Sequence, residues 1–156
     1  MTNISDKPDH LIRRCHQISV SLFFQECQGS DLTPIQYSIL SVLNSSEGMD
    51  QKTLAASTSL DKSTAAETIR RLEKKGLLQR RAADSDRRSR IVTLTELGKK
   101  VVVDLRPNVD HVHDRLINAL DEHERPLFIH LLKKICSELE SESRVKSAQI
   151  EVAGGE

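Results

Sequence analysis

Residues 60–95 read LDKSTAAETIRRLEKKGLLQRRAADSDRRSRIVTLT, and this stretch decides the fold. Its first part places apolar residues at helical spacing behind Asp61, and it ends at Gly76, a residue type that commonly terminates helices. Two short runs, 77–81 and 90–94, then flank an arginine-rich loop without a large apolar residue. The pattern predicts a helix through Lys75, followed by two short strands with a basic tip.

Helix signals also lie on both sides of this stretch. Thr33-Pro34-Ile35-Gln36 has the form of a capping box, and Asp50 opens a short helix that ends near Ser57. Thr95 opens a long helix that Pro107 is expected to bend, and residues 121–124 form a second capping box before a sixth helix. An earlier helix, over 9–28, has a predicted buried face of Leu11, Ile12, Cys15, Ile18, Ser19, Leu22 and Phe23.

The order of short helix, tight turn, helix and hairpin is that of a winged helix-turn-helix, which we place at residues 31–95. The predicted fold class is therefore mainly α with a small β-hairpin wing. Residues 1–30 and 96–145 carry apolar helix faces too wide for that lobe to cover, so we expect both chain ends to form the helical dimerisation region of a homodimer. A monomeric helical bundle is the alternative. Residues 146–156 are expected to be a disordered tail.

The charge distribution favours nucleic acid as a partner, although the 156-residue chain has no net charge. Residues 61–90 contain ten Lys or Arg and five Asp or Glu, which leaves this segment at +5. A helix fits the ~12 Å wide major groove of DNA, and a basic tip suits the narrower minor groove. We therefore predict binding to double-stranded DNA at a near-palindromic operator. A solvated charged helix and hairpin is the alternative.

Candidate DNA contacts lie on the polar side of the 61–75 helix and at the loop tip. Ala65, Ile69 and Leu72 share the opposite side of the helix. Ser63 and Thr64 fall in the first turn, where recognition helices meet base edges. Glu67 either accepts a hydrogen bond from cytosine or pairs with Arg71. The predicted DNA contacts are Lys62, Ser63, Thr64, Thr68, Arg70, Arg71, Arg87, Arg88 and Arg90.

The chain from Leu11 to Leu139 resembles a known family, the MarR-type (multiple antibiotic resistance) regulators. The most specific piece is DSDRRSRIVTLTELG, which looks like the family's Asp-x-Arg wing signature and the Leu-Thr-x-x-Gly start of its next helix. LTPIQYSIL resembles the family's second helix, and DKSTAAETIRRLEKKGLLQR its recognition helix. By that resemblance Asp86 and Arg88 form a structural wing pair, and Arg88 is a minor-groove candidate. The family binds DNA as a dimer, usually represses, and often releases DNA when a small molecule binds.

Residues LIRRCHQISVSLFFQE, LTPIQYSIL and MDQKTLA look most like the branch of this family that controls catabolism of aromatic compounds. In such proteins the effector sits between the dimer helices and the DNA-binding lobe. The resemblance implies that Arg13, Arg14 or His16 pairs with an aromatic or carboxylate effector and that Tyr37 or Phe23 flanks its ring. The alternative is that the two arginines are surface or interface charges and that Tyr37 belongs to the core.

Other functions have less support from the sequence. A cysteine-based redox-sensing regulator of the same fold would use Cys15, but Arg14 and His16 point away from it on a helix. No HxxxH pair, nucleophile elbow or phosphate loop occurs, so we expect no metal, no cofactor and no enzyme activity. A winged helix that binds only proteins remains open. Three widely spaced cysteines, no signal peptide and no long apolar run predict a cytoplasmic chain without a membrane span.

Overall fold

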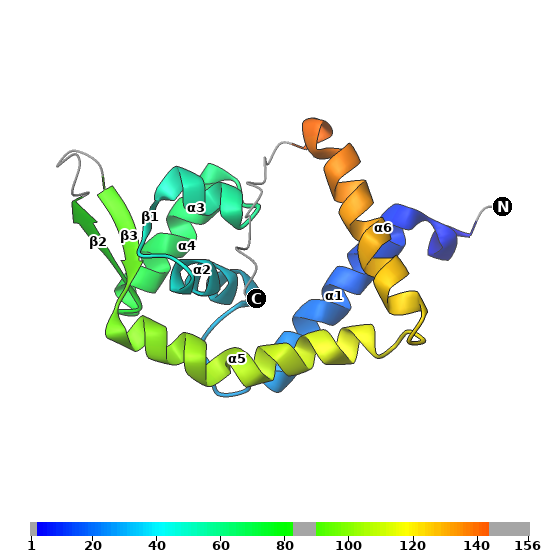
Figure 1. The fold of residues 1–156 in the computed structure, drawn as a ribbon, viewed down its shortest axis with the longest axis horizontal. Helices are drawn as coiled ribbons and strands as arrows, with labels where there is room; N and C mark the ends of the chain where they lie inside the picture. Colours follow the sequence, from blue (N-terminus) through cyan, green and yellow to red (C-terminus); the bar gives the residue numbers. More distant parts are fainter. Residues whose placement is uncertain (1–2, 83–89, 144–156) are drawn as a thin grey trace, which may run out of the picture.

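The computed structural model describes residues 3–82 and 90–143, without the side chain of Arg90. Six α-helices, two short 3-10 turns and three short strands make up this part of the chain (Figure 1). The helices are α1 (Pro8–Glu26), α2 (Pro34–Asn44), α3 (Gln51–Ser57), α4 (Lys62–Lys74), α5 (Glu96–Ile117) and α6 (Glu124–Glu138). The strands are β1 (Met49–Asp50), β2 (Leu78–Ala82) and β3 (Arg90–Leu94), and the 3-10 turns are η1 (Ile4–Asp6) and η2 (Glu140–Glu142).

The predicted helix starts before α2 to α5 are confirmed. Thr33 and Gln36 form a complete capping box, in which Gln36 N–H donates to Thr33 Oγ1 over 3.2 Å and Thr33 N–H to Gln36 Oε1 over 3.1 Å. Asp50 and Asp61 accept backbone N–H groups at the starts of α3 and α4, and Thr95 does so for α5. These short polar side chains satisfy donors that a helix leaves unpaired, so local sequence fixes where the helices begin.

The three strands form one antiparallel sheet in the order β1-β3-β2. The hairpin of β2 and β3 was predicted, with Leu78 opposite Leu94 and Arg80 opposite Val92. Strand β1 was not predicted, because it consists of two residues that pair with β3 through tertiary contact alone. Strand β1 therefore attaches the base of the wing to the start of α3.

Helix α5 lies directly against the backbone that leads into the wing. A Cβ at Gly98 would lie 2.2 Å from the carbonyl oxygen of Leu77, so only glycine fits there without displacing the backbone. The same Leu77 carbonyl accepts the N–H of Thr95 over 3.1 Å, and Thr95 Oγ1 donates to the carbonyl of Gly76 over 2.7 Å. These contacts hold the first turn of α5 to the lobe formed by α2, α3, α4 and the sheet.

One hydrophobic core lies between α2, α3, α4 and the sheet, and a second joins α1 to α2 and α5. The first contains Ile39, Leu40, Leu54, Ile69 and Leu72, which are all fully buried. The second consists of Phe23, Cys27, Tyr37, Val109 and Val112. Figure 1 shows the lobe of α2, α3, α4 and the sheet on the left. Helix α5 runs along the bottom from this lobe toward α1 and α6 on the right.

The predicted buried face of α1 is largely wrong for a single chain. Only Phe23 of that face is buried, whereas Leu11, Ile12, Cys15 and Ile18 are exposed. No second layer of the same chain lies over the N-terminal half of α1 within the described residues, so its apolar side chains face outward. Helix α6 likewise contains no buried residue, and all its residues except the half-buried Arg125 are exposed.

Two further details concern the predictions for the C-terminal helices. Pro107 lies inside α5, which continues through it as one helix of 22 residues, and the bend expected there stays a prediction. The second capping box is only half formed: the Glu124 carboxylate accepts from the Asp121 N–H over 2.9 Å, but His123 rather than Asp121 occupies the N-cap position. Among the described helices, none combines the length and the apolar character needed to cross a membrane.

Candidate DNA-binding surface and an adjoining cavity

Helix α4 presents a polar, basic face to solvent and an apolar face to the core. Ala65, Ile69 and Leu72 are fully buried, while Lys62, Ser63, Arg70 and Arg71 are exposed. The helix is amphipathic because these two groups of residues alternate at helical spacing. Thr64 is half-buried at the edge of the exposed face.

Asp61 orders the first turn of this face. Its carboxylate accepts from the N–H groups of Ser63 and Thr64, each over 2.9 Å, and from Thr64 Oγ1 over 2.5 Å. The pKa of Asp61 is lowered mainly by the Thr64 hydroxyl and then by the Thr64 N–H, so the carboxylate stays ionised. The cap therefore holds the hydroxyl-bearing end of α4 in a fixed position.

Glu67 links the two arginines of the exposed face. It lies 2.8 Å from Arg70 Nη2 and 2.8 Å from Arg71 Nε, and all three side chains are largely exposed. The pKa of Glu67 is lowered, first by the hydrogen bond from Arg71 and then by that from Arg70. Of the two sequence alternatives for Glu67, pairing within the helix is what the structure shows.

Thr68 does not belong to the exposed face and is a correction to the predicted contacts. It is buried, and its hydroxyl donates to the carbonyl of Thr64 over 2.7 Å. Its position one residue before Ile69 turns it toward the groove between α4 and α2. A side chain enclosed in this way cannot reach a base edge without a change in the helix.

The tip of the wing lies outside the described residues. Asp86, Arg87 and Arg88 belong to it, and of Arg90 only the backbone in β3 is described. The root of the wing carries two cations that were not singled out from sequence. Arg80 Nε lies 2.9 Å from Glu73 Oε1, and Arg81 Nη2 donates to the carbonyl of Glu47 over 3.2 Å. Their only sequence signal was the excess of positive charge in this segment.

The predicted effector residues do not come together in one place. Phe23 and Tyr37 lie in the second core with ring centroids 6.2 Å apart, and burial raises the pKa of Tyr37. Arg14 is exposed, and Arg13 Nη2 contacts His10 Nδ1 over 3.2 Å on the surface. Tyr37 is therefore a core residue, which was the alternative to its role as an effector contact. Of the five predicted effector residues, His16 lines the cavity described next.

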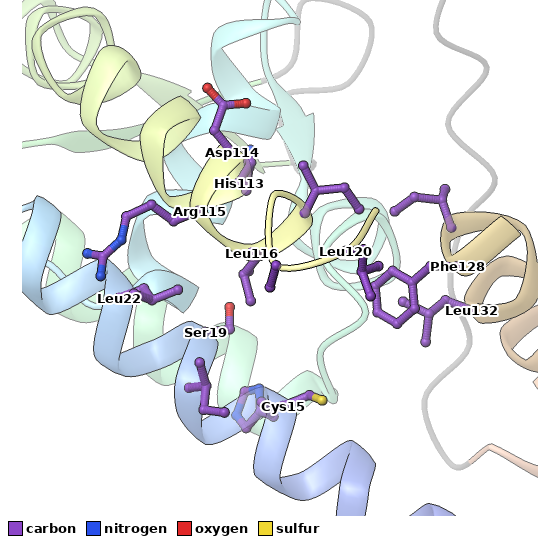
Figure 2. Close-up of a pocket in the computed structure, with 15 residues that line it drawn as sticks. Cys15, Ser19, Leu22, His113, Asp114, Arg115, Leu116, Leu120, Phe128 and Leu132 are labelled. Atoms are coloured by element: carbon purple, nitrogen blue, oxygen red, sulfur yellow. The ribbon is translucent and has the colours of Figure 1, made fainter. Parts of the chain in front are cut away.

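This cavity lies between α1, the end of α5 and α6, and its volume is about 800 Å³ (Figure 2). Its walls are mostly apolar. The residues that line it are Cys15, His16, Ile18, Ser19, Leu22, His113, Asp114, Arg115, Leu116, Ile117, Ala119, Leu120, Phe128, Ile129 and Leu132.

Glu26, at the end of α1, joins α1 to α5 beside this cavity. Its carboxylate lies 2.5 Å from Arg115 Nη1 and 2.8 Å from His111 Nδ1, and its carbonyl accepts from Asn108 Nδ2 over 2.7 Å. The pKa of Glu26 is lowered, first by the His111 hydrogen bond and then by that from Arg115. We call these four residues the α1–α5 clamp.

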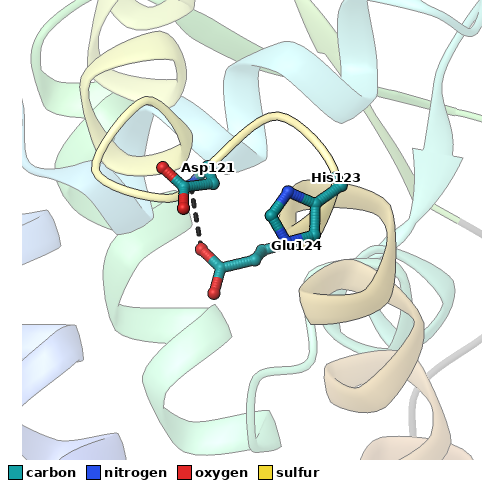
Figure 3. A group of neighbouring side chains, drawn as sticks. All are labelled: Asp121, His123 and Glu124. Atoms are coloured by element: carbon teal, nitrogen blue, oxygen red, sulfur yellow. Dashed lines mark hydrogen bonds between the residues drawn. The ribbon is translucent and has the colours of Figure 1, made fainter.

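Asp121, His123 and Glu124 cluster at the turn between α5 and α6 (Figure 3). Each offers one potential metal-ligand atom, and these atoms lie within 4.8 Å of one another. All three side chains are exposed, and Glu124 already accepts from the Asp121 N–H. This hydrogen bond is the usual one at a helix start, so it explains why Asp121 and Glu124 lie close together without a metal ion. The absence of a metal site stays a prediction.

Comparison with known proteins decides the family. The model of the MarR family matches residues 32–90. The transcriptional regulator HosA of Escherichia coli O157:H7 is 30% identical over 132 residues, which are 85% of this chain and 96% of HosA. The chain belongs to the MarR family. The winged helix-turn-helix with helices from both chain ends is thus confirmed as its fold class.

Two solved MarR-like structures bear on what such proteins bind. BpsR of Bordetella bronchiseptica, whose DNA binding is regulated by 6-hydroxynicotinic acid, matches with a TM-score of 0.81 and 29% identity over 86% of this chain and 96% of BpsR. A second match is the transcriptional repressor CouR bound to a 23-mer DNA duplex, with a TM-score of 0.78 and 27% identity over 87% of this chain and 96% of CouR. Another CouR structure is from Rhodococcus jostii RHA1.

For this MarR-family chain the comparisons separate the alternatives raised from sequence. The relatives are transcriptional regulators, a class whose members are generally not enzymes. Cys15 is exposed at the cavity rather than buried, but the redox alternative gains no support from these relatives over a ligand-responsive regulator.

Proposed function

We propose that this MarR-family chain is a homodimeric, sequence-specific repressor that leaves its operator when a small aromatic or carboxylate effector binds. The exposed face of α4 carries the proposal. Lys62, Ser63, Arg70 and Arg71 face solvent beside the edge residue Thr64, and the inner face is mostly apolar. A surface helix with this composition, preceded by a short helix and a turn, matches what enters a major groove.

The contacts we assign to α4 follow from side-chain reach. Ser63 and Thr64 stand in the first turn, where a hydroxyl can donate to or accept from base edges. Lys62, Arg70 and Arg71 are long and charged, which suits phosphates or guanine. Thr68 is left out because it is buried. We retain Arg87, Arg88 and Arg90 as wing contacts on the strength of sequence alone, with Asp86 as a holder of the wing.

The homodimer is proposed from the uncovered apolar stripe of α6 and the start of α1. Leu127, Leu131 and Ile135 recur every four residues, so they lie on one face of α6, and Leu139 follows at the C-cap of that helix. They are all exposed, as are Leu11 and Ile12 of α1. A monomer rarely leaves so large an apolar surface in water. We therefore assign 1–30 and 96–145 to dimerisation and 31–95 to DNA binding.

The effector class is proposed from the relatives and from the cavity. BpsR responds to 6-hydroxynicotinic acid, an aromatic acid, and this chain has a cavity large enough for such a molecule. To move a dimer from 99% to 1% DNA-competent, an effector must favour the other state by ~5.5 kcal/mol. A ring buried in an apolar cavity together with a paired carboxylate has the right order of magnitude. The branch that controls aromatic catabolism remains our proposal on these grounds.

Selection of bound duplexes from a random pool tests this function. We expect a near-palindrome whose half-sites lie ~34–36 Å apart, and affinity that falls steeply as salt rises. Arg70→Ala should weaken binding and reduce the slope of log K against log salt by about 1. Arg106→Ala, on the exposed side of α5, is the control and should leave both unchanged. A chain that stays monomeric, or that selects no duplex, contradicts the proposal.

A further inference from the structure

We propose that Glu67 is a specificity-determining residue, which holds Arg71 by its Nε atom so that the other end of this arginine reads a guanine of the operator. This inference rests on the DNA binding proposed above, and it names one contact of α4 and the base that the contact recognises. The major-groove edge of guanine carries two hydrogen-bond acceptors, N7 and O6, and this pair of acceptors is the ligand.

The carboxylate of Glu67 uses the donors of two arginines unequally. From Arg70 it accepts the Nε–H over 2.9 Å and an Nη2–H over 2.8 Å, so one edge of that guanidinium is occupied. From Arg71 it accepts the Nε–H over 2.8 Å. A guanidinium carries five N–H donors, so both Nη groups of Arg71 stay outside its contact with Glu67.

The Nη end of an arginine matches the edge of guanine. Its two parallel donors fit O6 and N7 together, whereas contacts to phosphates carry no information about sequence. A long side chain loses rotamer freedom when it is fixed on a base, and this loss opposes binding. Because Glu67 already holds Arg71, less freedom remains to be lost in the one geometry that reads a base.

The pairing also directs Arg71 toward the end of α4 that we place in the groove. Thr64, Glu67 and Arg71 follow one another at spacings of three and four residues, so they share one side of the helix. All three border a groove between α4 and the start of α2, which Ser63 lines as well. Glu67 lies one turn before Arg71, so the ion pair draws the guanidinium toward the hydroxyl-bearing first turn.

The exposure of this cluster argues for a role in binding rather than in folding. The Glu67 side chain is 42% exposed and that of Arg71 is 63% exposed, and ion pairs so open to water add little to the stability of a fold. Lys62 and Lys74, on the same face, form no ion pair among the described residues. We assign these lysines, which are point charges, and the Nη1 group of Arg70 to phosphates.

The test starts from the operator obtained by selection and replaces its base pairs one at a time. Binding of the full-length dimer is measured by fluorescence anisotropy. At one base pair of each half-site the wild type should prefer guanine at least about fivefold, as expected for a bidentate arginine. Arg71→Gln should remove this preference. Glu67→Gln should weaken it at the same base pair and tighten binding to random duplex, so the ratio of specific to non-specific affinity falls.

A modified base tests the contact without any change in the protein. The base 7-deazaguanine lacks the N7 acceptor but retains O6. Placed at the preferred guanine, it should weaken binding of the wild type several-fold and leave binding of Arg71→Gln unchanged. If Glu67 instead accepts from the cytosine of that pair, the wild type will bind the modified operator normally, and the proposal is wrong.

The double variant shows whether Glu67 acts through Arg71. If it does, Glu67→Gln should cause no further loss of the guanine preference once Arg71→Gln is present. A further loss would mean that Glu67 reads a base itself, and it would overturn the proposal. The matched control is Glu96→Gln, which breaks an exposed ion pair with Lys99 on α5 and makes the same change in charge. The control should keep the preference, and an equal loss there would assign the effect to net charge alone.

Failure of this inference differs from failure of the proposed function. A chain that selects no duplex refutes operator binding, and the contact of Arg71 falls with it. A chain that selects a duplex, but keeps every base preference in Arg71→Gln, remains a DNA-binding regulator and refutes only the assignment of Glu67 and Arg71.

Discussion

Substitution of Gly98 by alanine tests whether α5 must lie directly against the backbone before the wing. The new Cβ would be 2.2 Å from the Leu77 carbonyl oxygen and 3.2 Å from Leu94 Cδ2. The Leu77 oxygen is held by the N–H of Thr95, so it cannot move away without loss of that hydrogen bond. Two opposite effects on the free energy of unfolding therefore compete at one position.

Helix propensity alone favours alanine over glycine by about 1 kcal/mol. The steric effect opposes it, because an ordinary contact between carbon and a carbonyl oxygen is ~3.3 Å or longer, so the two atoms must separate by about 1 Å. Overpacking of this kind costs ~1–3 kcal/mol, and contact with backbone places Gly98 at or beyond the upper end. We expect a net loss of about 2 kcal/mol, which lowers Tm by ~4–8 °C in a chain of this length.

Urea unfolding, followed by far-ultraviolet circular dichroism at one fixed protein concentration, measures this difference. Lys100→Ala is the matched control, since its exposed side chain lies two residues further along the same helix. If the Gly98→Ala protein equals the wild type or exceeds it by about 1 kcal/mol, propensity decides at this position and the close approach of α5 to Leu77 has no energetic weight.

Three other expectations concern charge, assembly and pH. Glu67→Gln releases Arg70 from its internal partner, so we expect tighter binding to non-operator duplex and a steeper salt dependence in fluorescence anisotropy; weaker binding would contradict this. Leu131→Glu places a charge on the apolar stripe of α6, and light scattering should then find monomers, whereas a persisting dimer would exclude α6 from the interface. Because the pKa of Glu26 is lowered in the folded chain, its ionised carboxylate stabilises the fold at pH values above the ordinary Glu pKa of 4.5. This stabilisation is lost as the pH falls below 4.5 and through the lowered pKa. The urea midpoint of the wild type should accordingly fall more between about pH 5 and pH 3 than that of Glu26→Gln, and parallel curves would refute the assignment.

The parts of the fold that sequence predicted are those encoded locally. Asp61, Thr33 and Gly76 act within one helical turn of their own positions, so their side chains and backbone preferences can be interpreted without knowledge of the rest of the chain. Strand β1 depends instead on pairing Met49 with Val92, which no local periodicity reveals. The exposed face of α1 was mistaken for a buried one, because periodicity shows that a face is apolar but not which chain covers it.

The same distinction applies to the sites. The hydroxyl and basic face of α4 follows from helical spacing alone, with Thr68 misplaced because it lies at the edge of the buried side. The cavity could not be foreseen, since it forms where three helices meet. Arg115 and Glu26 are 89 residues apart, and neither stands in a motif that would bring the two together.

The continuous course of α5 through Pro107 makes this helix a single lever. Its 22 residues span about 33 Å, with one end anchored beneath the wing at Gly98 and the other reaching the cavity at Leu116. A tilt of about 5° at the cavity end would swing the wing root by about 3 Å. Hydrogen bonds to base edges tolerate only a few tenths of an ångström. A movement too small to disturb packing around a ligand would thus suffice to break the grip on a groove.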